Sequence, residues 1–150
     1  MSKLKEQLYI LCIEYIKTRE TDIKKNIAEA QEAANDDSKS SAGDKFETGR
    51  ELMQQEIDLN LSRLADLDKL KQTLEKITPT MISSTAMPGC VVRTNNGNYY
   101  LSIGAGLLKV EDVGYYAISA ASPIGLKLVG LKVGDTFVFN GKNYVVESVA

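Results

Sequence analysis

YILCIEYIKTRETDIKKNIAEA, residues 9–30, carries the pattern that decides the fold of this chain. Mostly apolar or small side chains recur at alternating spacings of four and three residues, and the positions between them are largely polar. That spacing is typical of a helix with one buried seam, as in a coiled coil. The seam occupies Tyr9, Ile13, Ile16, Glu20, Ile23, Ile27, Ala30 and Ala34.

A second seam with the same spacing follows farther along the chain. Two of its positions, Asn60 and Lys71, are polar, which costs stability but can fix the register of paired helices. Between the seams lies NDDSKSSAGD, residues 35–44, whose Asp, Ser and Gly content is typical of a turn. We therefore predict an antiparallel coiled-coil hairpin over residues 1–77, with an acidic tip at about 35–47. The second seam consists of Met53, Ile57, Asn60, Leu64, Leu67, Lys71 and Leu74.

The start of the first helix is apolar on a second side. A helix with two apolar faces must be covered on both of them. The sequence therefore predicts that the C-terminal domain covers this second stripe. Its members are Leu4, Leu8, Leu11, Cys12 and Tyr15.

The composition changes at Thr78-Pro79, where we place a domain boundary. Residues 2–77 contain no proline, whereas all three prolines and nine of the eleven glycines follow. Residues 78–150 alternate in the manner of strands, with hairpin turns expected at Asn96-Gly97 and Asn140-Gly141. A short helix is expected over 122–129, with Pro123 at its first position. The fold class is α+β, with a small antiparallel sheet of about five strands packed on one helix.

The composition also excludes several classes of functional site. The chain has no histidine, which excludes Ser-His and Cys-His nucleophile pairs and histidine metal sites. Its net charge of −2 argues against a general nucleic-acid binder. No apolar run approaches a membrane span or a secretory signal, and the two cysteines are far apart. We expect a cytoplasmic protein with two reduced, buried thiols.

Two acids stand three residues apart at the expected start of the second helix, Asp44 and Glu47. Residues three apart share one helix face, so two carboxylates there can share a hard cation such as Mg²⁺. Carboxylates also favour helix N-termini for electrostatic reasons, so helix capping is the competing interpretation. Asp36 and Asp37, also at the tip, fit solvated turn acids.

Two motifs resemble the Gre family of bacterial transcript-cleavage factors. SPIGLKLVGLKVGD, residues 122–135, is similar to the family's Ser-Pro-x-Gly…Leu-x-Gly-x-x-x-Gly-Asp signature. GDKFE, residues 43–47, matches the Gly-Asp-x-x-Glu setting of the family's tip acids. The resemblance spans nearly the whole chain, and it implies an FKBP-like fold for residues 78–150.

The resemblance implies a partner and a mechanism. The family's hairpin enters the secondary channel of bacterial RNA polymerase. There Asp44 and Glu47 would steady a second Mg²⁺ and stimulate the polymerase's own cleavage of backtracked RNA, with Asp36 and Asp37 as possible auxiliary acids. Ser122, Pro123 and Gly125 are the polymerase-docking candidates. The chain would not be an enzyme itself, would meet the RNA 3′ end only indirectly, and would read no DNA sequence.

The chain also departs from the family. The tip is longer, Thr48-Gly49-Arg50-Glu51 replaces the usual Asn-Ala-Glu-Tyr, and Ala121 replaces a common aspartate. These departures leave open a Gre-fold regulator that occupies the channel without promoting cleavage. A chaperone-like coiled-coil clamp is a third interpretation, against which the acidic tip argues.

Overall fold

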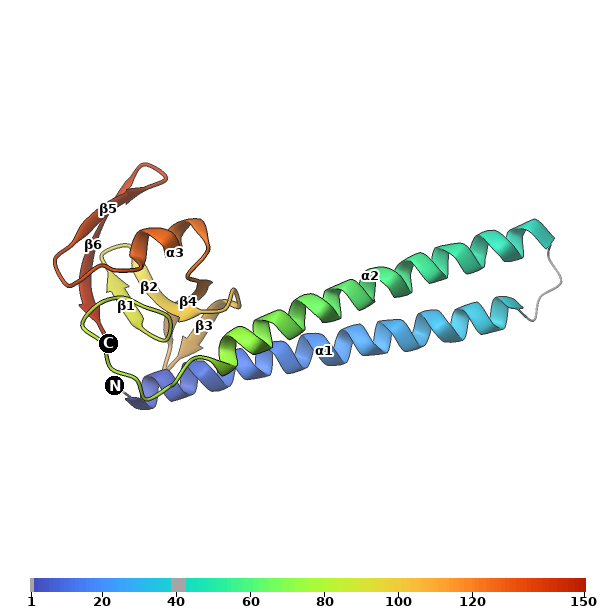
Figure 1. Ribbon diagram of the computed structural model, residues 1–150, viewed down its shortest axis with the longest axis horizontal. Helices are drawn as coiled ribbons and strands as arrows, with labels where there is room; N and C mark the ends of the chain where they lie inside the picture. The colour runs from blue at the N-terminus through green and yellow to red at the C-terminus, as the bar shows by residue number, and fades with distance from the viewer. Residues whose placement is uncertain (1, 39–42) are drawn as a thin grey trace. The chain divides into compact units, whose positions relative to one another are not determined.

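The computed structural model describes residues 2–38 and 43–150, and among these the side chains of 3–33 and 49–150. Two long helices, α1 (Ser2–Ser38) and α2 (Gly43–Glu75), precede a strand-rich region with one short helix, α3 (Pro123–Leu128) (Figure 1). The α+β class is therefore confirmed. The strands are β1 (Val91–Thr94), β2 (Gly97–Ser102), β3 (Gly106–Val110), β4 (Val113–Ser119), β5 (Thr136–Phe139) and β6 (Lys142–Val149).

The chain divides into two compact units, Ile16–Leu70 and Met1–Tyr15 with Lys71–Ala150. In the first unit each helical segment buries a single stripe. Between residues 16 and 30, only the five predicted seam positions are shielded from solvent. The second stripe follows the prediction from Met53 to Leu67, but Lys71 is exposed and Leu70 is half-buried in its place. The prediction that Lys71 belongs to the stripe was wrong. A buried stripe on a helix can continue either three or four residues after Leu67, and the apolar Leu70 occupies the first of these positions.

The second unit contains a six-stranded mixed sheet in the order β3-β4-β2-β1-β6-β5. The expectation of about five antiparallel strands was wrong in two respects. Strand β3 was not predicted, because Gly104 and Gly106 are typical of a loop. The pairing is also not purely antiparallel. Strand β4 pairs antiparallel with β3 on one side and parallel with β2 on the other.

Both predicted hairpins form. In the β5–β6 hairpin, Asn140 and Gly141 have φ values of 50° and 76° between the paired residues Phe139 and Lys142, as a two-residue primed turn requires. In the β1–β2 hairpin the turn lies one residue earlier than expected. Thr94 pairs with Gly97, so the turn residues are Asn95 and Asn96.

One face of this sheet, the α3 face, carries the apolar core of the unit. Leu128 of α3 belongs to a buried cluster with side chains from β1, β2 and β6, and the partly buried Ile124 and Leu131 pack against this cluster. Phe137 and Tyr144 stack with ring centroids 4.7 Å apart, which extends the core along the β5–β6 hairpin. The buried members are Ala86, Val92, Tyr99, Leu101, Leu128, Tyr144 and Val146.

The opposite face, the α1 face, is covered by the first turns of α1. Leu8 and Cys12 are completely buried there, and the Cys12 Sγ lies 3.5 Å from the Ser102 Oγ on β2. The Lys5 ammonium donates to the Met81 carbonyl oxygen. The prediction that the C-terminal residues cover the second stripe of the first helix is therefore confirmed at Leu8 and Cys12.

Candidate functional site

The predicted docking residues lie at the N-terminus of α3. Ser122 is the N-cap, with φ −68° and ψ 160°, and Pro123 occupies the first turn. The Ser122 Oγ accepts a hydrogen bond from the Gly125 N–H at 3.1 Å and donates one to the Ser119 carbonyl at 2.6 Å. The hydroxyl therefore joins the helix to the end of β4 and fixes the direction in which Pro123 is presented.

Gly125 holds this arrangement together by its lack of a side chain. A Cβ at this position would overlap the Ser119 carbonyl oxygen and would lie 2.8 Å from the Ser122 Oγ. Gly125 is itself buried, whereas Pro123 and Ala121 are exposed. In this unit, therefore, Gly125 positions the loop, and Pro123 and Ala121 are the groups that a partner can reach.

Exposed apolar side chains extend this surface. Leu126 is 68% exposed and Val129 is 41% exposed, three residues apart on α3 and just beyond it. Two backbone hydrogen bonds of 2.8 Å join Ala86 to Gly130 and Leu131, which brings the exposed Met87 alongside. Sequence reasoning missed these residues. The signal was present, because Ile124 and Leu128 already supply the buried stripe of so short a helix.

The predicted metal ligands lie at the other candidate site. Helix α2 begins at Gly43, so the backbones of Asp44 and Glu47 belong to its first two turns. The side chains of Asp44, Glu47, Asp36 and Asp37 lie outside the described residues, so the geometry of the acidic tip stays a prediction. Among the side chains that are described, no group of three or more metal-binding residues occurs.

The two thiols fit the expected structural role. Both cysteines are buried and unpaired, and the Cys90 Sγ lies 3.7 Å from the Thr85 carbonyl. Burial raises the pKa of Cys12, an effect that its hydrogen bond with Ser102 partly opposes. A thiol whose pKa is raised stays protonated at neutral pH, so Cys12 is a poor nucleophile.

Tyrosines on both faces of the sheet are similarly unreactive. Burial, with smaller contributions from the nearby Cys12 and Tyr9, raises the pKa of Tyr100 well above its ordinary value. Burial is also the main cause of the raised pKa of Tyr99, and Tyr144 adds to it. Both rings are buried in the unit, so neither Tyr99 nor Tyr100 offers an exposed face on which a partner could stack.

Comparison with known proteins does not assign the chain to a family. No protein-family model matches the sequence, and neither curated proteins nor solved structures yield a match. None of the described helices contains an apolar stretch of the length that a bilayer crossing needs.

Proposed function

We propose that this protein is a Gre-like transcription factor that binds bacterial RNA polymerase and stimulates its cleavage of backtracked RNA. The observation that carries the proposal is the structure formed by residues 122–135. Ser122 caps a helix that begins with Pro123, Gly125 fits against the Ser119 carbonyl, and the stretch ends at Asp135 just before β5. The signature residues thus form one continuous helix-and-loop segment, in which Gly125 and Leu128 are buried and Pro123 is exposed.

The order of elements supports the finer architecture. Two helices of 37 and 33 residues precede the sheet, and each buries one stripe where its side chains are described within the first unit, over 16–33 and 49–70. We propose that they pair as an antiparallel coiled coil and that the sheet unit is FKBP-like. A helix rises about 1.5 Å per residue, so each arm spans roughly 50 Å, enough to enter a deep channel.

The chemistry of the tip supports the proposed activity. With α2 beginning at Gly43, Asp44 and Glu47 lie one helical turn apart on one face. Their carboxylates are the hard oxygen ligands that Mg²⁺ prefers, but two ligands fill only part of its octahedral shell. The polymerase and water must supply the others, so this chain contributes to cleavage only in trans. A second Mg²⁺ held by Asp44 and Glu47 would supply activation of the attacking water and stabilisation of the leaving oxygen.

A second function is favoured by the residues that follow the tip acids. Gly49 weakens the helix by roughly 0.5–1 kcal/mol relative to alanine, and Arg50 adds a positive charge next to it. Gly49 and Arg50 therefore change the stability of the helix, and the charge on it, close to Asp44 and Glu47. A regulator that occupies the polymerase channel without promoting cleavage would retain the docking surface and the helices, and it would lose only the metal function.

RNA cleavage in backtracked elongation complexes of the cognate polymerase tests the proposal. The wild-type protein should accelerate shortening of the RNA. The double variant Asp44→Asn, Glu47→Gln should abolish the acceleration and still bind polymerase in a pull-down. The matched control is Glu29→Gln, Glu32→Gln, which removes two exposed acids at the same spacing on α1 and should accelerate shortening of the RNA as the wild type does.

The other outcomes separate the candidates. Binding without acceleration by the wild-type protein would favour the channel-occupying regulator. Undiminished cleavage by the tip variant would refute the metal role of Asp44 and Glu47. An absence of polymerase binding would refute both proposals.

A further inference from the structure

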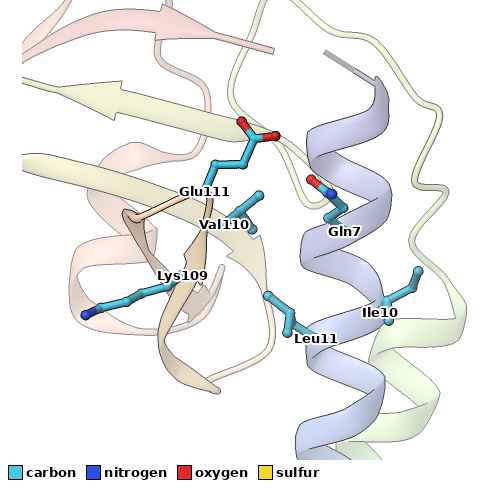
Figure 2. A pocket seen from close by; sticks show the side chains of 6 residues that line it. All are labelled: Gln7, Ile10, Leu11, Lys109, Val110 and Glu111. Atoms are coloured by element: carbon cyan, nitrogen blue, oxygen red, sulfur yellow. The ribbon is translucent and has the colours of Figure 1, made fainter.

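Two adjoining hollows lie between the first turns of α1 and the β3–β4 turn, within a single compact unit. The first, of about 310 Å³, is bordered by Gln7, Ile10 and Leu11 on the helix and by residues 109–111 on the strand side. Figure 2 shows Gln7, Leu11 and Val110 directed into the space between helix and strand. The second hollow, of about 350 Å³, shares Gln7, Val110 and Glu111 with the first, so the two form one groove.

Strand β3 borders this groove and is an edge strand with a single protecting charge. It ends the sheet, so one row of its backbone groups pairs with no strand in the described part of the chain. Edge strands are usually protected by bulges, prolines or several charges. The β3 register with β4 is regular from Gly106 to Val110, and Lys109 is its one charged residue. Leu107 is 51% exposed and pairs with Tyr116, which is 46% exposed.

The charges around the groove favour an acidic occupant. Lys3 and Arg93 line the second hollow against the single acid Glu111, whereas the Lys109 side chain extends from β3 away from α1 (Figure 2). The Arg93 guanidinium is held in place, because it donates to the Tyr115 hydroxyl at 3.0 Å and lies 5.7 Å from that ring's centroid. A net positive groove in a chain of net charge −2 selects for a negatively charged partner.

We propose that the β3 edge and this groove bind an extended, acidic segment of a partner protein. The segment adds to β3 as a further strand, so main-chain hydrogen bonds supply affinity. One of its apolar side chains fills the hollow against Leu11 and Val110, and a carboxylate next to it meets Lys3 and Arg93. This interaction is independent of the polymerase-docking surface at α3 and of the acidic tip.

Selection from a random-peptide library displayed on phage, with the full-length protein as bait, tests this proposal. The enriched peptides should combine alternating apolar residues with at least one acid. A synthetic peptide of the enriched sequence should shift backbone amide resonances of residues 7–11 and 106–110. Methylating its backbone nitrogens one at a time should weaken binding at alternate residues, because a paired strand offers every second N–H to its neighbour.

Charge reversal supplies the matched variants. Lys3→Glu with Lys109→Glu changes two exposed residues beside the groove and should weaken peptide binding about tenfold or more. Lys132→Glu with Lys142→Glu makes the same charge change away from the groove and should leave binding unchanged. Circular dichroism should show both variants to be folded.

Three results would overturn the proposal. The first is a library without an enriched acidic–apolar pattern, and the second is a set of resonance shifts that falls outside the groove and β3. The third is a homodimer in solution that the Lys3→Glu, Lys109→Glu variant separates, because the edge would then serve a second copy of this chain.

Discussion

At the residue scale, Gly125 occupies a position where the surrounding atoms leave no room for a side chain. A Cβ there would overlap the Ser119 carbonyl oxygen and press on the Ser122 Oγ, so the cap of α3 would have to move. We predict that Gly125→Ala destabilises the protein by roughly 2 kcal/mol or more, since loss of a cap alone costs about 0.5–2 kcal/mol. Thermal unfolding of the two proteins measures this. Polymerase binding should weaken as well.

The control for this substitution is Gly104→Ala. Gly104 is exposed, its φ is not in the left-handed region, and nothing lies within 4 Å of an added Cβ. Its stability should change by less than about 0.5 kcal/mol. Equal effects of the two substitutions would mean that the contact with Ser119 does not restrict the loop.

At the scale of the element, the stripe on α2 contains a residue that works against stability. Asn60 is 1% exposed; its Nδ2 donates to the Glu56 carbonyl at 2.9 Å, but its Oδ1 has no hydrogen-bond partner among the described residues. An unsatisfied buried acceptor costs about 1–3 kcal/mol. We predict that Asn60→Leu stabilises the helices by an amount in that range, measured by chemical denaturation. As a control, Asn26→Leu at an exposed position should leave the stability nearly unchanged. Destabilisation by Asn60→Leu would instead show that Asn60 makes a polar contact essential to the unit.

Elements set by local chemistry could be predicted from the sequence, and elements set by distant pairing could not. The Asn140-Gly141 turn and the Ser122-Pro123 cap depend on a few adjacent residues, so both were found. The β1–β2 turn was placed one residue late, because three consecutive residues, Asn95 to Gly97, all favour turns. The parallel pairing of β2 with β4 has no local signal, since it follows from where the chain goes after β3.

At the scale of the whole molecule, the compact unit that contains the sheet is not continuous in sequence. It needs residues 1–15 as well as 71–150, because Leu8 and Cys12 are buried on the α1 face of the sheet. We predict that a fragment of residues 78–150 unfolds at a lower temperature than the sheet of the full chain. Each fully buried apolar side chain of this kind contributes about 1.5–3 kcal/mol, so removing the helix exposes several of them at once.

A peptide of residues 1–15 added to this fragment should raise its unfolding temperature in a concentration-dependent manner, because a ligand that binds only the folded state stabilises it. The variant peptide with Leu8→Asp should fail to do so, since a carboxylate at a fully buried site opposes docking. If the fragment alone is as stable as the full chain, then Thr78-Pro79 is a true folding boundary and the helix merely rests on the sheet. If the peptide restores stability, the sheet and the start of α1 form one cooperative unit, and the start of α1 is fixed by the same sheet that positions α3 on its other face.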